Sequence, residues 1–391
     1  MNASISNLNK QTNKINPFLD KNVLKNLRNS TPFFVFSKQA LLHNLKDYQN
    51  SLPPKTEICY SMKANSEKPV LQTLNEASAS FELASNYELT LLKTLNVPAQ
   101  RIIFGSSVKA SNHIKDFVKY GVDRFACDSE EELFKISKHA QGSRVYIRAL
   151  VDNKADSVFH MSEKFGVPLK ETIDLLIKAK NLGLVPYGIS FNVGSQARNE
   201  YAWARGIADV ASAMLILSEK GIKLQVINIG GGFPHKYEGN DRIPTIKEIS
   251  KHISGAIKKL PYPVNLIVEP GRGLVANTYV LVTSITEKIM RHNGYWLHLD
   301  AGVYNALLEA MAYQGSIRYR IEPMDDYPSS TKEKFILTGP CCDDLDVIEE
   351  DALLPNKLKV SDKLIIYDTG AYTFTLMTRF NGYPKPKTVL L

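Results

Sequence analysis

Three short segments carry side chains that could do chemistry together. Lys63 follows the apolar run Ile58-Cys59-Tyr60, at the point where the chain turns polar. A glycine run, Gly230-Gly231-Gly232, and an acid-arginine turn, Glu269-Pro270-Gly271-Arg272, come later in the chain. A lysine amine can bond covalently to an aldehyde, glycine N–H groups can approach a phosphate closely, and an arginine can hold that phosphate. Together the three segments predict a site for pyridoxal phosphate, a phosphorylated aldehyde.

Each segment also has a plainer explanation when it is taken alone. Most lysines at strand ends are solvated charges, three glycines can simply form a tight turn, and Ser195 can cap a helix instead of binding phosphate. Glu269 directly follows the apolar run Leu266-Ile267-Val268, where a bare carboxylate is costly and implies a partner. That partner is either the pyridine nitrogen of the cofactor, which a carboxylate would keep protonated, or Arg148 or Arg272 in a salt bridge.

Apolar runs typical of strands alternate with helix-period segments between residues 38 and 275. Eight strands are expected, near residues 56–62, 80–84, 101–105, 123–127, 144–150, 186–193, 224–230 and 264–270. Amphipathic segments such as 130–139 and 203–220 are expected to form helices between them. Eight βα units over about 240 residues match a (β/α)8 TIM barrel, so the expected fold class is α/β.

Unusual polar residues and glycines fall at the expected C-terminal ends of these strands. They are Lys63, Glu82, Asp128, Arg148, Asn192, Gly194, Ser195, Gly230 to Gly232, Glu269 and Arg272. In a TIM barrel the active groups come from these strand ends, and the loops after strands seven and eight usually hold phosphate. Their convergence is stronger evidence for one site than any single motif.

After Arg272 the pattern changes to short β-rich runs punctuated by proline and glycine. The runs cover residues 279–286, 295–299, 335–338 and 363–367, with little helical periodicity. They predict a second, mostly β domain over residues 276–391. Residues 1–37 are expected to form an N-terminal arm whose strand, residues 33–36, pairs with the β domain, and residues 38–275 to form the barrel.

The composition predicts a soluble protein that binds neither membrane nor nucleic acid. Of the 391 residues, 44% are hydrophobic and 23% are charged, enough to bury a large core. No apolar run approaches the roughly 18 residues that a membrane helix needs. The net charge of +8 comes from lysines spread along expected helices, with no basic block. The four cysteines, Cys59, Cys127, Cys341 and Cys342, lack CxxC spacing, which favours a reducing cytoplasm.

Four more segments extend the pattern. They are Cys127-Asp128-Ser129, Ser190-Phe191-Asn192-Val193-Gly194-Ser195-Gln196, Gly339-Pro340-Cys341-Cys342-Asp343-Asp344-Leu345-Asp346 and Gly370-Ala371-Tyr372. With Lys63, the glycine run and the acid-arginine turn, they make the chain resemble the fold-type III pyridoxal phosphate decarboxylases that act on ornithine, lysine, arginine or diaminopimelate. The resemblance covers roughly residues 30 to 385.

This resemblance implies a barrel that binds pyridoxal 5′-phosphate and a homodimer in which each active site is completed by the partner subunit. The implied catalytic residues are Lys63, which binds the cofactor covalently, Glu269, which pairs with its pyridine nitrogen, Asn192 and Cys342. The implied cofactor-binding residues are Lys63, Glu82, Arg148, Asn192, Ser195, Gly231, Gly232, Glu269, Gly271, Arg272 and Tyr372, of which Ser195, Gly232, Arg272 and Tyr372 hold the phosphate. No metal is implied.

The substrate class follows from the same resemblance. The pair Cys342-Asp343 is similar to the ornithine and lysine enzymes, whereas the diaminopimelate enzymes usually carry Cys-Glu-Ser there. In the family the cysteine reprotonates the substrate Cα and the aspartate contacts the distal amine, and both come from the partner subunit. A basic L-amino acid is therefore the expected substrate, and polyamine biosynthesis the expected pathway. Asp325 or Asp326 could bind the cationic tail as well, although loop aspartates are more often turn formers.

Two departures from the family leave alternatives open. Asn192 stands where the family commonly has a histidine that stacks on the cofactor ring, and Glu82 stands where related chains often have aspartate. Asparagine cannot stack or titrate like imidazole. It could redirect the reaction to decarboxylative oxidation, transamination or racemisation, or mark a non-catalytic regulatory relative. The change to Glu82 could simply shift a hydrogen bond.

Overall fold

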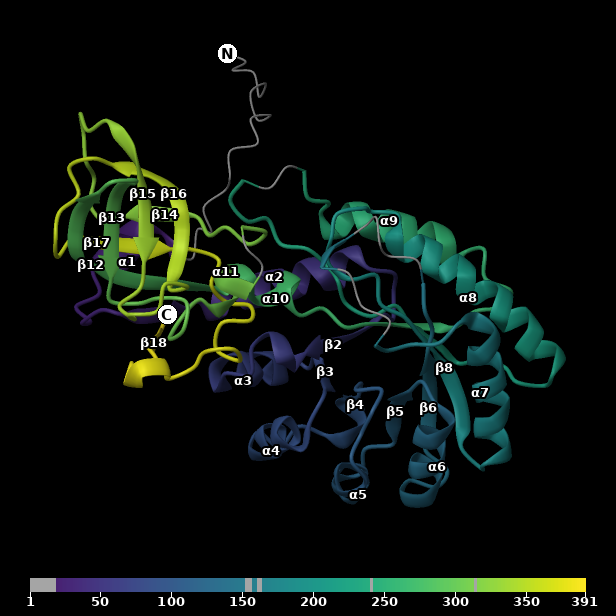
Figure 1. Ribbon diagram of the computed structural model, residues 1–391. Coiled ribbons are helices and arrows are strands. Elements are labelled where there is room, and N and C mark those ends of the chain that lie inside the picture. Colours follow the sequence, from purple (N-terminus) through teal and green to yellow (C-terminus); the bar gives the residue numbers. More distant parts are fainter. Residues whose placement is uncertain (1–18, 152–156, 160–163, 240–241, 313–314) are drawn as a thin grey trace, which may run out of the picture.

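Eight parallel strands close into a barrel, as the alternating pattern predicts (Figure 1). The structure is a computed structural model, and it describes residues 19–151, 157–159, 164–239, 242–312 and 315–391. The barrel strands are β2 Glu57–Ser61, β3 Ser80–Leu83, β4 Ile102–Phe104, β5 Arg124–Cys127, β6 Arg144–Arg148, β8 Val185–Ser190, β10 Val226–Asn228 and β11 Asn265–Val268. Pairing of β11 with β2 completes the circle. All eight expected strands form, and the predicted α/β barrel is confirmed.

Helices surround the barrel between consecutive strands (Figure 1). They are α2 Lys38–Ser51, α3 Lys68–Glu76, α4 Asn86–Thr94, α5 Ser111–Tyr120, α6 Glu130–His139, α7 Leu169–Asn181, α8 Ala202–Glu219 and α9 Ile246–Ile257. The side chains of Ser85, Ser129 and Thr245 cap α4, α6 and α9 by accepting backbone N–H groups. The caps of α4 and α6 begin these helices shortly after β3 and β5, whereas a long loop separates β10 from α9.

The second part of the chain is a mostly β domain, as expected. Its strands are β12 Tyr279–Arg291, β13 Gly294–Leu299, β14 Ile321–Pro323, β15 Lys332–Thr338, β16 Val347–Pro355 and β17 Lys363–Ile366, in the spatial order β14-β17-β12-β13-β15-β16. Strand β1, Phe33–Phe36, pairs antiparallel with β12, and β18, Lys387–Leu390, pairs parallel with β1. The described ends of the chain therefore meet in this domain, beside the barrel (Figure 1).

The described part of the N-terminal arm packs against the β domain. Its short helix α1, Lys21–Lys25, is capped by Asp20, and Leu19 and Leu24 are buried against β-domain residues such as Val280. Burial of these side chains holds the arm in place. Residues 1–18 of the expected arm lie outside the described residues.

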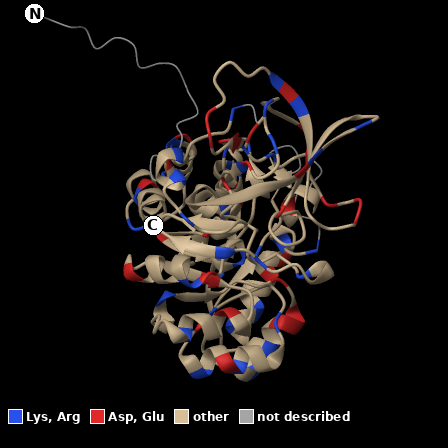
Figure 2. Cartoon of the chain, turned by 90° about the vertical axis from the view of Figure 1, so that its left-hand side faces the viewer, with Lys and Arg blue, Asp and Glu red and all other residues tan. Residues whose placement is uncertain are grey.

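Charged side chains of both signs are mixed over the surface. In Figure 2 lysines and arginines alternate with aspartates and glutamates along the helices, and no block of one sign stands out on the visible face. This distribution agrees with the expectation that the excess of lysines forms solvated helix faces. No helix among the described residues is long and apolar enough to cross a membrane.

Candidate active site

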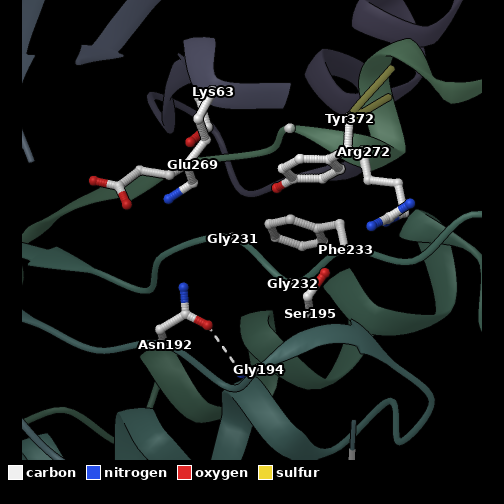
Figure 3. Close-up of a pocket in the computed structure, with 12 residues that line it drawn as sticks. Lys63, Asn192, Gly194, Ser195, Gly231, Gly232, Phe233, Glu269, Arg272 and Tyr372 are labelled. Atoms are coloured by element: carbon white, nitrogen blue, oxygen red, sulfur yellow. Dashed lines mark hydrogen bonds between the residues drawn. The ribbon is translucent and has the colours of Figure 1, made fainter. Parts of the chain in front are cut away.

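A cavity opens at the C-terminal ends of the barrel strands (Figure 3). It has an empty volume of about 510 Å³, including its mouth, and is lined by Ser61, Lys63, Asn192, Gly194, Ser195, Gly231, Gly232, Phe233, Glu269, Gly271, Arg272 and Tyr372. Of the residues predicted to bind the cofactor, all except Glu82 and Arg148 line this cavity. Lys63 and Glu269 lie at one end, and Arg272 and Tyr372 at the other (Figure 3).

Lys63 is presented to the cavity by a single 3₁₀ turn, Met62–Ala64, directly after β2. The side chains of Met62 and Ala64 are buried, whereas Lys63 is exposed to the cavity. The turn is anchored to the distant loop that carries Tyr372, because Ala64 O accepts the Tyr372 N–H at 2.7 Å and Lys63 O accepts from Thr375 Oγ1 at 3.0 Å. The lysine therefore sits on a fixed support with its amine free to reach a ligand.

Glu82 favours the charged form of Lys63. Its negative charge is the largest influence on the pKa of Lys63, which is raised above its ordinary value although burial acts against it. The carboxylate is buried and accepts a hydrogen bond from Ser61 Oγ at 2.5 Å. A Cβ at position 105 would lie 2.4 Å from Glu82 Oε1, so Gly105 makes the room for this longer side chain. The amine is thus an ammonium ion before a ligand binds.

Glu269 is a half-buried carboxylate held by an amide. Asn228 Nδ2 donates to Glu269 Oε1 at 2.6 Å, and Asn228 Oδ1 accepts the Gly230 N–H at 3.0 Å. Burial, followed by the charge of Glu82, raises the pKa of Glu269 to about 7. Neither of the two arginine salt bridges considered for Glu269 forms among the described residues. The sequence reasoning missed Asn228, although an asparagine inside the apolar strand β10 was an available signal.

This environment predicts a pH dependence of stability. The folded cofactor-free protein holds a proton on Glu269 up to about pH 7, whereas the ordinary value is 4.5. The stability that this group contributes is therefore present below pH 4.5 and is lost as the pH rises to about 7. In cofactor-free Glu269→Gln, which carries no buried charge, the melting temperature should exceed that of the wild type at pH 8 by at least about 2 °C. The difference should shrink towards pH 5.

Thermal melts of both cofactor-free proteins from pH 5 to pH 8 measure this difference. Bound cofactor should abolish or reverse it at pH 8, because a protonated ring nitrogen gives Glu269 a positive partner. A difference that stays constant with pH would show that Glu269 does not titrate in this range. The same result with and without cofactor would contradict its pairing with the ring.

The glycine run fits tightly against two other loops. A Cβ at Gly232 would lie 2.3 Å from Gly194 O, and a Cβ at Gly231 would lie 2.6 Å from Glu269 O. Gly232 also has a φ of +89°, which L side chains rarely adopt. The carbonyl oxygen atoms of Gly231 and Gly232 accept from Trp203 Nε1 at 3.1 Å and from the Ala197 N–H at 3.0 Å. The glycines form a narrow, anchored cradle beside Ser195.

Arg272 lies at the opposite end from Lys63, but its guanidinium is already engaged. Arg272 Nη1 donates to Glu309 Oε2 at 2.7 Å and to the Tyr237 hydroxyl at 2.9 Å, and Nη2 donates to Glu309 Oε1. A carboxylate of matching geometry therefore engages both terminal nitrogens, and the role of Arg272 at the phosphate stays a prediction. Arg272 Nε is buried and has no hydrogen-bond partner among the described residues, so its N–H is a donor that a ligand would satisfy.

Of the predicted site residues Asn192 and Arg148, only Asn192 lines the cavity. Asn192 lines the cavity, and its Oδ1 accepts the Gly194 N–H at 2.9 Å, the dashed line in Figure 3. This bond fixes a small polar amide at the position of the family's histidine. Arg148, at the end of β6, does not line the cavity, and its guanidinium lies 5.6 Å from the centre of the Phe165 ring. Its positive charge only partly opposes the rise in the pKa of Lys63 that Glu82 causes.

Four residues expected at the substrate do not line the cavity of their own chain. Cys342 is exposed and Asp343 half-buried in the loop between β15 and β16. Asp325 and Asp326 lie on the β domain, where Asp326 pairs with Lys21 at 2.6 Å and Asp325 with Lys25 at 4.0 Å. Neither aspartate lines the cavity of its own chain, and their role at the substrate stays a prediction.

The cavity fits pyridoxal phosphate on features of its own. Its two ends present a lysine beside a half-buried carboxylate and, opposite, a glycine cradle with Ser195 and the unpartnered Arg272 Nε. A Cβ in the cradle would clash with the backbone of the neighbouring loops, so only glycine allows this close arrangement. A ring with an aldehyde, a basic nitrogen and a phosphate matches this arrangement of donors and charges. The fold and the site define a barrel enzyme that uses pyridoxal phosphate.

Comparison with known proteins agrees with this class. The family model "Pyridoxal-dependent decarboxylase, pyridoxal binding domain" matches residues 38–276. The chain is 29% identical to lysine/ornithine decarboxylase of Selenomonas ruminantium, over 92% of this chain and 89% of that protein, and 34% identical to antizyme inhibitor 2 of Xenopus laevis, over 84% and 74%. The arginine decarboxylase of Paramecium bursaria Chlorella virus, bound to agmatine, superposes with a TM-score of 0.87 at 28% identity, over 95% and 98%.

The chain therefore belongs to the pyridoxal-dependent decarboxylase family. It binds pyridoxal 5′-phosphate and is a pyridoxal phosphate-dependent carboxy-lyase, which confirms the cofactor and the enzyme class that the sequence implies.

Proposed function

We propose that this enzyme decarboxylates a basic L-amino acid, ornithine, lysine or arginine, to the corresponding amine and carbon dioxide. The observation that carries the proposal is the single cavity in which Lys63 and the half-buried Glu269 face a glycine-lined anchor. Relatives named for lysine, ornithine and arginine support the substrate class. The acidic side chain of Asp343 beside the Cys342 thiol supports a cationic substrate tail.

The residues of the cavity have distinct tasks in this reaction. Bound pyridoxal 5′-phosphate supplies an electron sink for the electron pair that departing carbon dioxide leaves behind. Glu269 keeps a proton on the ring nitrogen, which strengthens that sink. Lys63 holds the cofactor until the substrate amine takes its place, and its amine then moves protons inside the cavity. The aromatic rings of Phe233 and Tyr372 wall the cavity and exclude water from the breaking bond.

The final proton comes from the partner subunit in this proposal. Cys342 of the partner subunit donates it to the substrate Cα, and the partner's Asp343 pairs with the distal cation. The exposure of the Cys342 loop in the single chain supports this arrangement, since a loop that leaves its own cavity is free to enter another. The enzyme is accordingly a homodimer with shared active sites. Its four free cysteines suit a reducing cytoplasm.

A substrate panel tests the proposed function. Cofactor-loaded enzyme is incubated in air with L- and D-ornithine, lysine, arginine and diaminopimelate, and every product is identified by mass spectrometry. Conversion of one L-form basic amino acid to its amine is the expected result. Exclusive use of diaminopimelate, or products that keep the carboxyl group, would contradict the proposal.

In the alternative reaction, Asn192 lets an aldehyde or ketone form in place of the amine. An imidazole at this position could stack on the cofactor ring and keep water and dioxygen from its face, whereas the amide of Asn192 is tied to Gly194. Any aldehyde or ketone formed by the wild type should therefore fall by about threefold or more, relative to amine, in Asn192→His. Mass spectrometry of the products measures the ratio. Asn181→His, on the exposed end of α7, is the matched control. An unchanged ratio of aldehyde or ketone to amine in both variants would contradict the role of Asn192.

A regulatory role without catalysis is the second candidate, because one relative is named as an antizyme inhibitor. The presence of Lys63, Glu269 and Arg272 in one cavity favours catalysis. Purified protein that shows the visible absorbance of bound cofactor and turns over any member of the panel would exclude the regulatory candidate. Protein that shows neither would support it.

A further inference from the structure

Glu309 lies behind the phosphate end of the cavity and is not one of the residues that line it. It belongs to the short helix α11, Leu308–Ala312, in the β domain, and its side chain is 2% exposed. Both of its carboxylate oxygens accept from the terminal nitrogens of Arg272, whose side chain is 4% exposed. A buried pair of this kind is two-point and directional, so it fixes the plane of the guanidinium as well as its position.

Aromatic rings enclose the same guanidinium. Its central carbon lies 4.7 Å from the centre of the Tyr372 ring, 5.7 Å from that of Tyr237 and 5.8 Å from that of Phe159. The Tyr237 hydroxyl also accepts from Arg272 Nη1. These rings keep water from the pair, and in such surroundings a buried charge that loses its partner is strongly disfavoured.

One donor of Arg272 is left for a ligand. The two terminal nitrogens are engaged by Glu309 and Tyr237, while Nε is buried without a partner among the described residues, and Arg272 lines the cavity. Because the terminal nitrogens are held, the guanidinium cannot turn them towards the cavity without breaking three hydrogen bonds, two to Glu309 and one to Tyr237. The phosphate end of the cavity therefore receives an oriented N–H donor from Arg272. The positive charge of the guanidinium is largely offset by the carboxylate of Glu309.

We propose that Glu309 is a positioning residue that holds Arg272 so that Nε faces the cofactor phosphate, and that it thereby sets the affinity of the enzyme for the phosphorylated cofactor. The phosphate is then held mainly by oriented hydrogen-bond donors, which come from Arg272 Nε, Ser195 and the glycine cradle. The net positive charge at this end contributes less. The β domain, through α11, thus contributes to cofactor binding in the barrel. This inference rests on cofactor binding and not on which amino acid the enzyme decarboxylates.

Comparing two ligands that differ by the phosphate tests this role. Cofactor-free protein is titrated with pyridoxal 5′-phosphate and, separately, with pyridoxal, which has the same ring and aldehyde, and binding is followed by absorbance. Glu309→Gln keeps the shape but loses the charge and one acceptor. It should weaken pyridoxal phosphate by about tenfold or more and pyridoxal by less than about twofold. Glu309→Asp, which keeps the charge on a shorter side chain, should lie between Glu309→Gln and wild type.

A double-mutant cycle separates positioning from general loss of structure. In an Arg272→Gln background, Glu309→Gln should cause no further loss of pyridoxal phosphate affinity, because Glu309 acts through Arg272. The double variant also avoids an unpaired buried charge, which guards against misfolding of the single variant. Glu171→Gln, on the exposed face of α7, is the control and should leave both affinities unchanged.

Three results would overturn the proposal. Equal losses for pyridoxal phosphate and pyridoxal in Glu309→Gln would show that the residue supports the fold and not the phosphate end of the cavity. Tighter binding of pyridoxal phosphate would show that Glu309 competes with the phosphate for Arg272. Additive losses in the double variant would show that it acts independently of Arg272.

Discussion

Replacement of Lys63 with alanine is expected to lower turnover by about 10²- to 10⁴-fold and to abolish covalent retention of the cofactor. Lys63 is the amine that the 3₁₀ turn after β2 presents to the cavity, beside Glu82 and Glu269. The variant loses both the covalent anchor and the group that moves protons at the substrate. Amine formation under saturating substrate gives the rate.

Borohydride trapping followed by peptide mass spectrometry locates the attachment. In the wild type the added mass should fall on the peptide that contains Lys63, and in Lys63→Ala no lysine should carry it. Lys68→Ala, five positions along the chain and exposed at the start of α3, is the matched control and should behave as wild type. Trapping at another lysine, or more than a tenth of the wild-type rate in Lys63→Ala, would refute the assignment.

The second large effect is expected at Cys342 and not at its neighbour Cys341. The Sγ atoms of both accept from Asn381 Nδ2 at 3.2 Å, but Cys342 is exposed whereas Cys341 is partly covered. Cys342→Ala should lower the rate of amine formation by about 10²-fold, because the proton donor to Cα is lost. Cys341→Ala is the internal control and should stay within about threefold of the wild type.

Mixing two inactive variants tests whether the site is shared. Lys63→Ala and Cys342→Ala subunits, unfolded or dissociated together and reassembled, should regain up to about a quarter of the wild-type activity. Half of the randomly formed dimers contain one intact site of two. No gain on mixing would show that Lys63 and Cys342 of one chain serve the same site. A monomer in solution would lead to the same conclusion.

The sequence predicted the barrel because its signals are local. Each strand is a short apolar run between polar breaks, and the cavity residues Lys63, Asn192 and Glu269 follow directly after such runs. A closed parallel barrel brings all strand ends to one face, so strand order alone is enough to gather them. The role of the glycine run could be predicted for the same reason, since three consecutive glycines indicate a close approach of backbones.

Ion pairs between side chains that are distant in the sequence could not be predicted from it. Glu309 meets Arg272 from the other domain, and no local pattern marks a glutamate in a short helix as its partner. Arg272 was therefore predicted to hold the phosphate, with no sign of this carboxylate partner. The partners of Asp326 were equally hidden, because Lys21 and Lys25 lie some 300 positions earlier in an arm with little apolar pattern. Hydropathy predicts helices and strands, but it does not reveal which charged side chains pair with one another across the fold.

The most direct test follows the fate of the carboxyl group and of the new proton together. Cofactor-loaded enzyme is given its best substrate from the panel in deuterium oxide, and carbon dioxide and amine are quantified while the amine is examined for deuterium. We predict one carbon dioxide per amine and one deuterium at the former Cα, because the Cys342 thiol exchanges with solvent before it donates. An aldehyde, a ketone or an amino acid that keeps its carboxyl group as the main product would contradict the proposed reaction.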